Sequence, residues 1–583
     1  MDSNIEMNNK NVVFFSPHAS IWQHSFPESI LADHLKKLGM NIDYVGCKDI
    51  LSKQCTTMWM SENKKDHLNT FDKKKICENC IHDQKKITNN FKYNYSTLED
   101  FVSLEDLKKI NHILESLKKK NVYKISKYSY EGIEVGKFAL YETVLSYKKL
   151  NLKFKSTEKK KYLLDLRGCL ISLFAFKKIF KQKNYYGIFL YNSNYAKNRT
   201  IKFFAEKIGI KVFSIHAGGN FHNRLQRLMI TLKEHTYHDF YLKEKIWEIY
   251  KKVRLTKDTI QDVINHFKNL FIARNVFVYS SPASKNINVR NFFKIDKQKK
   301  IILVILSSPD ERISANMIGT KISSQKVFKD VFEWINFLIK NFSSRNDVAL
   351  IIRPHPREFP NKREKILSEN AIKLSYLFSK IKNNKNVIIN LPSDNISIYN
   401  IIPYCDTVLT MGSTSTIEAT LLGIPCVTMS ENFLSFPKDL TIVSLSKKKY
   451  LKSINYSLTK KLDLNLAKKT FRWFVLKQYY STLNLSNLFY FPETSFLFRI
   501  FWKFFKNFIK SYHIIKYKIF CSYSLCNDLR FFFNSNQIAF IKNNLPIKKI
   551  LAKDEDFLLK KGIKKILKLS YFDKSLSNKF INF

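Results

Sequence analysis

The stretch TVLTMGSTSTIEATLLGIPCV, residues 407–427, contains in one run the strand, turn and helix that decide the fold. Residues 407–410 predict a short strand, and Gly412 predicts a turn directly after it. The helix predicted next opens at Ser413 and ends near Gly423, and the residues that follow predict another strand. A strand that leads through a glycine turn into a helix and then into a further strand is the repeating unit of a parallel α/β sheet.

The N-terminal region shows the same alternation. Residues 11–16 are apolar and predict a buried strand, and a loop is expected over residues 17–25. The next segment, residues 26–39, has Pro27 near its start and glycine at its end, which predicts a helix over this range. A second strand follows at residues 41–45. This unit predicts the opening of a doubly wound α/β domain.

A second domain of the same kind is predicted after the basic linker at residues 294–300. Residues 301–306 form a continuous apolar run of the kind buried on both faces of a parallel sheet. An amphipathic helix is predicted for residues 325–341 and a further strand for residues 348–352. Because 583 residues are too many for one ordinary core, two or more domains are expected.

Four consecutive hydroxyl residues after Gly412 predict an anion site. Amides in the first turn of a helix have no acceptor within the helix, and the helix dipole also favours negative charge there. Phosphate is the ligand that this chemistry favours. Glu418, one turn further on, either accepts hydrogen bonds from ribose hydroxyls or closes a capping box with Ser415. The residues assigned to nucleotide binding in this segment are Gly412, Ser413, Thr414, Ser415, Thr416 and Glu418.

A cationic segment, RPHPR at residues 353–357, follows the predicted strand 348–352. Two prolines stiffen it, and guanidinium groups donate paired hydrogen bonds to phosphate. Open α/β sheets bind ligands at the carboxyl edge of their strands. Arg353, His355 and Arg357 are therefore expected to hold a diphosphate.

Two loops with small residues are expected to line the cleft. The segment HAGG, residues 216–219, follows a predicted strand, and glycines let the backbone approach a ligand closely. His216 and Gly218 are assigned to this loop, with a turn that carries an incidental histidine as the alternative. Ser307 and Ser308 end the first strand of the second domain and are assigned to the other loop.

The segments Arg353–Pro356 and Gly412–Pro425 together resemble the donor domain of GT-B glycosyltransferases that build bacterial capsule and other surface polysaccharides, including sialyl-, polysialyl- and Kdo-transferase-like groups. In that family the His-Pro and Ser/Thr motifs contact the nucleotide phosphates, and a glutamate holds the ribose. The resemblance implies a glycosyltransferase with a nucleotide-sugar donor and a glycan or lipid-linked acceptor. It is firm over about residues 300–440, and the N-terminal half matches mainly in layout.

The fold that this resemblance implies consists of two Rossmann-like α/β domains that face each other across a cleft. We expect an acceptor domain with insertions at residues 1–290, a donor domain at 295–445, and a helical extension rich in basic and aromatic residues at 446–583. A C-terminal helix of GT-B enzymes commonly crosses back to the first domain, and residues 467–480 are the candidate. No DxD-type metal motif is recognised, so no cofactor is expected to be required for catalysis.

The base candidate lies in the first loop. The segment QHSFP at residues 23–27 resembles the histidine, followed three positions later by proline, that is the catalytic base of inverting GT-B enzymes. This resemblance makes His24 the candidate base, with His18 as the fallback and a purely structural histidine as the alternative. A neutral imidazole can take the proton of the acceptor hydroxyl while that oxygen attacks C1 of the sugar.

Four cysteines of the N-terminal region form a candidate metal site. Cys77 and Cys80 have the spacing of a zinc knuckle, and Cys47 and Cys55 lie upstream. One interpretation is a structural zinc ion or iron-sulfur cluster. The other is four unligated thiols in a reducing cytosol.

The formal charge of +50, from 99 Lys and Arg against 49 Asp and Glu, favours anionic partners such as a membrane surface. A genome whose base composition inflates Lys, Asn, Ile, Phe and Tyr together is the alternative origin of this charge. Residues 496–520 mix aromatic residues and lysine at helical intervals, as interfacial helices and core helices both do. Basic residues interrupt this segment too often for a membrane span, and residues 1–10 are polar, unlike a signal peptide. We expect a cytoplasmic protein, peripheral on the inner face of the cytoplasmic membrane.

Three other functions remain open. A polyol-phosphate transferase of the CDP-glycerol type shares similar motifs, and a sugar-nucleotide 2-epimerase shares the fold and a Gly-Ser plus Glu segment. A nucleic-acid-binding protein fits the charge, but no nucleic-acid-binding motif is recognised, so nucleic acid is not the expected partner. The sequence patterns do not distinguish the sugar, the base of the nucleotide or the stereochemical outcome.

Overall fold

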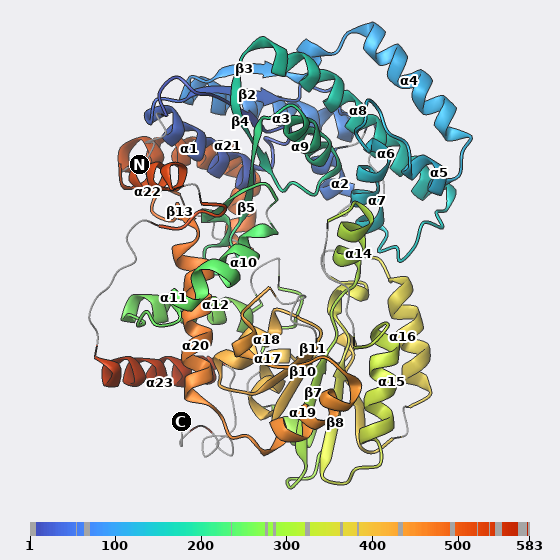
Figure 1. The fold of residues 1–583 in the computed structure, drawn as a ribbon, viewed down its shortest axis with the longest axis vertical. Coiled ribbons are helices and arrows are strands. Elements are labelled where there is room, and N and C mark those ends of the chain that lie inside the picture. The colour runs from blue at the N-terminus through green and yellow to red at the C-terminus, as the bar shows by residue number, and fades with distance from the viewer. Residues whose placement is uncertain are drawn as a thin grey trace.

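A computed structural model shows two β-sheets flanked by helices, one in each half of the molecule, of which the first is mainly parallel and the second fully parallel (Figure 1). It describes residues 7–569 and residue 580, except residues 54, 63–69, 235, 274–277, 284–286, 321–326, 362–364, 382–383, 430–434, 490–495, 522, 536 and 543–550. Within these ranges, none of the helices combines the length and the apolar character needed to cross a membrane.

The first sheet has seven strands in the order β13-β6-β5-β4-β1-β2-β3. Its first five strands in the sequence run parallel, whereas β6 is antiparallel to β5, and β13 to β6. The strands are β1 (Asn11–Phe15), β2 (Asn41–Gly46), β3 (Asn94–Thr97), β4 (Tyr185–Tyr191), β5 (Lys211–Ala217), β6 (Arg227–Leu232) and β13 (Leu483–Asn484).

The second sheet has six strands, all parallel, in the order β12-β11-β10-β7-β8-β9. In each sheet the first six strands along the chain follow the order 3-2-1-4-5-6 of Rossmann-like domains, so the predicted fold class is confirmed. Apolar clusters cover both faces of each sheet. The strands are β7 (Lys300–Ile305), β8 (Val348–Arg353), β9 (Val387–Ile389), β10 (Thr407–Thr410), β11 (Cys426–Met429) and β12 (Ile442–Ser444).

Helices flank both sheets. Those around the first sheet are α1 (Trp22–Lys37), α2 (Thr56–Glu62), α3 (Thr70–Phe91), α4 (Leu104–Lys118), α5 (Val122–Ser126), α6 (Val135–Phe138), α7 (Leu140–Ser146), α8 (Ser156–Gln182) and α9 (Ala196–Lys207). The central segment contains η2 (Arg224–Gln226), α10 (Tyr237–Tyr241), α11 (Trp247–Tyr250), α12 (Lys257–Phe271) and α13 (Val289–Phe292). The second sheet is followed or flanked by α14 (Asp310–Met317), α15 (Val331–Phe342), α16 (Glu369–Ser379), α17 (Ile398–Ile401), α18 (Ser415–Leu421) and α19 (Lys447–Thr459).

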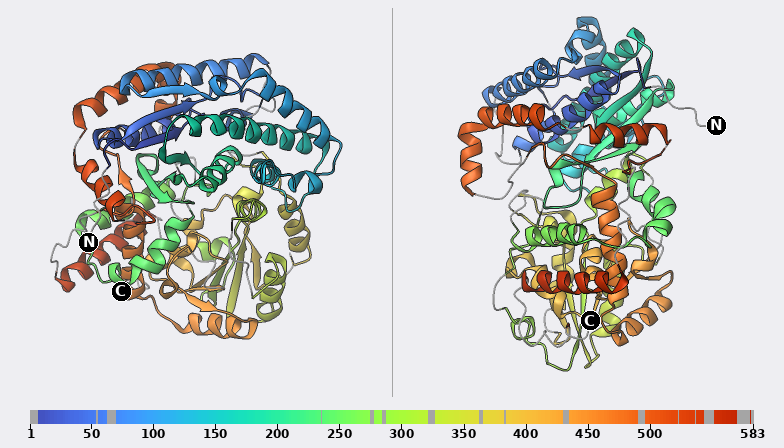
Figure 2. Two further views of the ribbon diagram at one scale, coloured as in Figure 1. Left: turned by 45° about the horizontal axis from the view of Figure 1, so that its top comes forward. Right: turned by 90° about the vertical axis from the view of Figure 1, so that its left-hand side faces the viewer.

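The C-terminal part of the chain spreads over both domains (Figures 1 and 2). Helix α20 (Leu464–Val475) and the π-helical turn η9 (Leu476–Tyr480) run from α18 back to the first sheet, where β13 pairs with β6. Thus the segment 467–480 crosses between the domains. Helices α21 (Phe496–Phe520) and α22 (Ser524–Asn534) cover part of the first domain, and α23 (Ala552–Leu569) packs on α12.

Helices α1, α15 and α18 begin at other residues than the sequence predicts, and α18 begins at Ser415, two residues after the predicted start. Helix α1 begins at Trp22, four residues earlier than predicted, and Pro27 lies inside it. The rings of Trp22 and Phe26 stack 4.9 Å apart and are fully buried, which stabilises the helix despite the proline. Helix α15 begins at Val331, because the side chain of Asp330 accepts the amide hydrogen bonds of its first turn.

Candidate functional site

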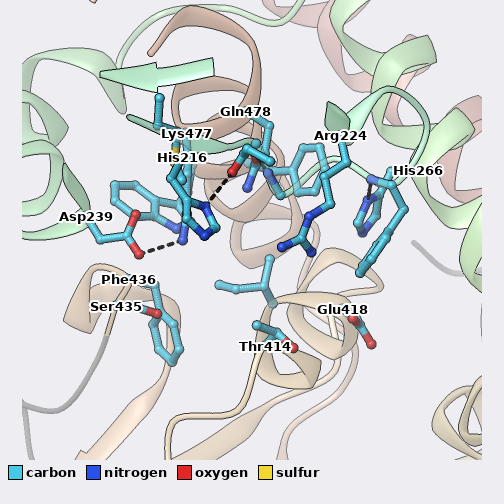
Figure 3. Close-up of a pocket in the computed structure, with 18 of the residues that line it drawn as sticks. His216, Arg224, Asp239, His266, Thr414, Glu418, Ser435, Phe436, Lys477 and Gln478 are labelled. Atoms are coloured by element: carbon cyan, nitrogen blue, oxygen red, sulfur yellow. Dashed lines mark hydrogen bonds and ion pairs between the residues drawn. The ribbon is translucent and has the colours of Figure 1, made fainter. Parts of the chain in front are cut away.

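A cavity of about 450 Å³ lies between the two domains (Figure 3). Its walls come from the end of β5 and from η2, α10 and α12 on one side and from α18 on the other, and α20 and η9 contribute a third wall. The lining residues are His216, Ala217, Gly218, Gly219, Phe221, Arg224, Met229, Thr236, Asp239, Phe240, His266, Thr414, Ile417, Glu418, Leu421, Ser435, Phe436, Trp473, Phe474, Lys477 and Gln478.

The second domain contributes the start of α18. Gly412 follows β10 with φ +88°, a backbone conformation that L side chains rarely adopt, and this turn brings the chain into the helix. Thr414 lines the cavity, whereas Thr416 points into the protein, where its hydroxyl lies 2.7 Å from that of Thr410. Ser413 accepts a hydrogen bond from the amide of Ser415 within the turn. The helix start therefore presents Thr414 to the cavity.

Glu418 is the acidic residue of α18 that lines the cavity. Burial raises the pKa of its carboxyl group to about 7, although the hydrogen bond from the Tyr399 hydroxyl acts to lower that pKa. Among the described residues, one carboxyl oxygen of Glu418 has no hydrogen-bond partner. Ser415 is the first residue of α18 and not its N-cap, which is Thr414, so the predicted capping box of Ser415 with Glu418 is not formed. The carboxyl group is thus placed to meet a hydroxyl-bearing ligand.

The cationic segment after β8 does not line this cavity. Arg353 is buried and donates hydrogen bonds to the side chain of Asn390 and, at 3.2 Å, to the carbonyl of Ile396. Arg357 forms ion pairs with Asp310, at 3.1 Å, and with Glu311. Both guanidinium groups thereby hold loops at the carboxyl edge of the second sheet.

His355 lies between these arginines. Its Nδ1 accepts the amide hydrogen bond of Arg357 at 3.1 Å, and its ring lies 5.7 Å from that of Tyr279. Burial, and next the charge of Arg357, lower the pKa of His355 to about 4. The ring is therefore neutral at pH 7.

The serine loop after β7 is likewise engaged inside the second domain. The Ser308 hydroxyl donates to the carboxylate of Asp310 at 2.7 Å and also contacts that of Glu358. Ser307 is half-buried beside it. Neither serine lines the cavity.

The loop after β5 brings the two residues predicted for the cleft, His216 and Gly218, to the cavity wall. The ring of His216 hydrogen-bonds through Nδ1 to the carbonyl of Ala217 at 2.9 Å. The amide of Gly219 donates to Gln478 at 2.7 Å, and a Cβ on Gly219 would lie 2.5 Å from the Nε2 atom of that glutamine. Glycine at this position therefore permits the contact between the β5 loop and η9.

Two more histidines lie behind this wall. The ring of His24, in the first turn of α1, stacks on that of Tyr191 with centroids 4.2 Å apart, and Tyr191 lies 5.9 Å from His216. His18 lies 6.2 Å from His24. Burial is the main cause that lowers the pKa of His24 well below its usual value and that of His18 to about 4. Both are neutral at pH 7, and Tyr191 separates them from the cavity-lining His216.

Two cavity-lining cations do not follow from the sequence patterns. Figure 3 shows Arg224 extending from the first domain toward Thr414 and Glu418. Lys477, from η9, pairs with Asp239 of α10 at 2.7 Å. Burial opposes the ionisation of Asp239, but Lys477 and His238 together lower its pKa to about 2, so the pair is charged. Arg224 could have been suspected from the sequence, because it lies six residues after Gly218 in the predicted cleft loop. Lys477 could not, because it lies in the segment predicted as a C-terminal extension.

The four N-terminal cysteines have free thiols. Cys80 lies against the first loop, with its sulfur 3.8 Å from the carbonyl of Pro17. Burial raises the pKa of Cys77 to about 12 and that of Cys80 to about 11, and it also raises the pKa of Cys47 and Cys55. Over the described ranges, no three His, Cys, Asp or Glu side chains are arranged to hold a metal ion.

Comparisons with known proteins find structural similarity alone. No family model matches the chain, and no curated protein matches it. A β-Kdo 2,4 transferase, KpsC of Thermosulfurimonas dismutans, is similar at 10% identity and a TM-score of 0.28, over 49% of this chain and 79% of that one. The UDP-GlcNAc 2-epimerase of Methanocaldococcus jannaschii, solved with UDP-GlcNAc and UDP, is similar at 14% identity and a TM-score of 0.26, over 79% and 97%. Similarity this low does not assign a function to the chain.

Proposed function

We propose that the protein is a glycosyltransferase that binds a nucleotide-sugar donor between its domains and transfers the sugar to a growing surface polysaccharide or a lipid-linked glycan. The observation that supports this most is the interdomain cavity, where Thr414 and Glu418 face His216 and Arg224. Apolar and aromatic walls with a few convergent polar groups are typical of small-molecule sites. The cavity also opens at the carboxyl edge of a Rossmann-like sheet, where such folds bind nucleotides.

In this proposal the donor phosphates lie between Thr414 and Arg224. A guanidinium donates charge-assisted hydrogen bonds to phosphate, and the hydroxyl of Thr414 adds a neutral one. Glu418 accepts hydrogen bonds from the ribose hydroxyls, which favour its ionised form and thus oppose the effect of burial on its pKa. Arg353 and Arg357 support the surrounding loops and do not touch the donor.

The proposed proton acceptor is His216. When Nδ1 of the neutral ring donates to the carbonyl of Ala217, Nε2 carries the lone pair that takes a proton. The acceptor hydroxyl loses its proton to Nε2, its oxygen bonds to C1 of the sugar, and the bond from C1 to the departing phosphate oxygen breaks. Arg224 stabilises the negative charge that develops on this phosphate. No metal ion is required by this proposal.

A nucleotide screen tests the proposal. The protein is heated with CMP, CDP, UDP, GDP or dTDP, and one of them is expected to raise the melting temperature, as a ligand at about 100 times its Kd adds about 2.7 kcal/mol to the free energy of unfolding. Glu418→Gln is expected to lose about half of that shift, because a tenfold weaker Kd leaves about 1.4 kcal/mol at the same nucleotide concentration. Stabilisation by single-stranded RNA but by no nucleotide would contradict the proposal.

A second assay separates transfer from the related chemistries. The nucleotide sugar that stabilises the protein is incubated with and without a glycan acceptor, and the products are analysed by mass spectrometry and NMR. Transfer to the acceptor supports the proposal. A 2-epimerised nucleotide sugar formed without acceptor, or transfer of glycerol phosphate from CDP-glycerol, would replace it with one of the alternatives.

The proposed location is the inner face of the cytoplasmic membrane, which the charge of +50 favours.

A further inference from the structure

Helix α21 carries a row of exposed apolar side chains along one face. Their exposed fractions run from 49% to 68% although all are large and apolar or aromatic. Phe508, Tyr512, Ile515 and Ile519 are spaced three or four residues apart, which places them on one side of the helix. From 508 to 519 this row is about 17 Å long at 1.5 Å per residue. Phe505 lies at a kink of α21, and Phe520 is its last residue. The α21 stripe consists of Phe505, Phe508, Tyr512, Ile515, Ile519 and Phe520.

The opposite face of α21 fixes how the helix is rotated. His513 accepts a hydrogen bond from the indole of Trp22 at 3.2 Å, and the hydroxyl of Tyr517 donates to Asp33 at 2.6 Å. Lys510 is buried and pairs with Asp83 of α3. Ile514 belongs to the apolar cluster between α1 and the first sheet. Because these contacts hold the inner face, the stripe faces outward in the folded protein.

Positive charge borders the stripe. Residues 496–523 contain six basic residues and no acidic residue. Lys518 is exposed on α21, and Lys516 is partly exposed. Helix α3 lies alongside, since Lys86 donates to the Asn507 carbonyl and the Ser511 hydroxyl, and its Lys74, Lys75 and Lys85 are exposed.

We propose that the α21 stripe is a docking surface for an anionic lipid bilayer, with its apolar side chains in the headgroup and acyl boundary and its lysines at the phosphates. An amphipathic helix lying in the plane of the interface has this combination of an apolar face and basic flanks. A second copy of the chain fits less well, because it would bring two lysine-bordered stripes of equal charge together. Figure 2 shows α21 and α22, in orange-red, on the outside of the first domain, where a flat surface can reach them. The inference rests on this surface and does not depend on the proposed reaction.

Vesicle co-sedimentation of the full chain tests the docking surface. The protein is mixed with vesicles of 30% phosphatidylglycerol in phosphatidylcholine, or of phosphatidylcholine alone, and the bound fraction is measured. Wild type is expected to bind the anionic vesicles. The variant F508S/I515S/I519S, which keeps the charge, is expected to bind at least about tenfold more weakly, because each lost side chain removes buried apolar area.

A matched control separates the stripe from the overall charge. The variant L367S/I372S/Y376S removes three large side chains of the second domain, just before and within α16, that are exposed by 47%, 56% and 67%. It is expected to bind anionic vesicles like wild type. Equal binding by the stripe variant and the control would overturn the proposal, because the charge of +50 alone would then account for binding.

Hydrogen exchange and sedimentation velocity test the α21 stripe in two further ways. Hydrogen exchange of wild type is expected to slow in residues 505–523 when anionic vesicles are added. This measurement uses no variant, so it does not depend on whether the stripe variant folds. Sedimentation velocity checks the oligomeric state. Unchanged exchange in this helix, or a dimer that the stripe variant dissociates while vesicle binding persists, would overturn the proposal.

Discussion

The two sides of the cavity are built in different ways. The α18 side comes mostly from one short run, in which Thr414, Ile417, Glu418 and Leu421 follow β10, and Ser435 and Phe436 complete it. The opposite side combines the β5 loop, η2, α10, α12 and η9, and its Asp239 and Lys477 lie 238 residues apart in the sequence. The local side is therefore fixed by one strand, turn and helix, whereas the composite side depends on the crossing of α20 and η9.

The strongest test of the composite side is Arg224→Gln. If Arg224 stabilises the departing phosphate, kcat/KM for transfer is expected to fall about 10²- to 10³-fold, the usual effect of removing one donor to developing charge. The melting temperature should change little. Arg530→Gln, at an exposed arginine on α22, is the matched control and should keep wild-type activity. Equal activity of the two variants would remove Arg224 from the proposed mechanism.

The next test separates the histidines of this side. His216→Ala is expected to lower kcat about a hundredfold with nucleotide binding retained, because the proton acceptor is lost. His24→Ala should have a smaller effect, since Tyr191 lies between His24 and His216. Steady-state kinetics and nucleotide titration measure both variants, with the exposed His82→Ala as control. A larger loss for His24→Ala than for His216→Ala would restore the base assignment based on the resemblance.

On the local side, Glu418→Gln is expected to weaken nucleotide binding about tenfold at pH 8, or about 1.4 kcal/mol, by removing the charged acceptor for ribose hydroxyls. The difference from wild type should shrink at pH 6, because Glu418, with a pKa of about 7, is then mostly protonated in the unliganded wild type. Isothermal titration calorimetry at both pH values measures this. A difference that does not depend on pH would contradict the assignment.

The same variant has an expected effect on stability. Burial raises the pKa of Glu418 from 4.5 to about 7, so the folded protein binds the proton more tightly than the unfolded chain. The stability from this proton is fully present below pH 4.5 and is lost as the pH rises through about 7. The melting temperature of Glu418→Gln minus that of wild type should therefore be larger at pH 8.5 than at pH 4.5. A difference that falls with rising pH would contradict the raised pKa of Glu418 in the folded protein.

The smallest expected effect concerns the contact between the β5 loop and η9. Gly219→Ala places a Cβ 2.5 Å from Nε2 of Gln478, so the Gln478 side chain must move and its hydrogen bond with the Gly219 amide is disturbed. We expect a loss of about 1–2 kcal/mol in the free energy of unfolding and a fall of a few-fold in transfer. Gly209→Ala is the comparison, because a Cβ there meets nothing within 4 Å, although φ is +80°. Equal activity of both variants would show that the contact between Gly219 and Gln478 does not matter for transfer.

Much of the fold could be predicted from the sequence. The apolar runs at 11–16 and 301–306 became β1 and β7, because strands buried on both faces need continuous apolar residues. The start of α1 was less predictable, since the burial of Trp22 and Phe26 involves His513 and Phe489, which lie far along the chain. Such contacts leave no local pattern.

The candidate site divides in the same way. Thr414 and Glu418 could be assigned from the sequence because a strand, a glycine turn and a helix place neighbouring residues together. For Arg353 and Arg357 the positive charge can be read from the sequence, but the direction in which each side chain points cannot. The ion pair of Arg357 with Asp310 and the hydrogen bond of Arg353 to Ile396 decide that direction. The residue type was thus predictable and the contact was not.

By itself, the sequence determined two α/β domains and the strand, turn and helix at residues 407–423, because hydrophobic periodicity and turn chemistry act between near neighbours. Only the tertiary structure decided that Arg224 and Lys477 line the same cavity as this helix start. Ion pairs, burial and close backbone approach depend on segments that folding brings together over hundreds of residues. For that reason the positions of the cavity's cations could not be predicted from the sequence, whereas those of Thr414 and Glu418 could.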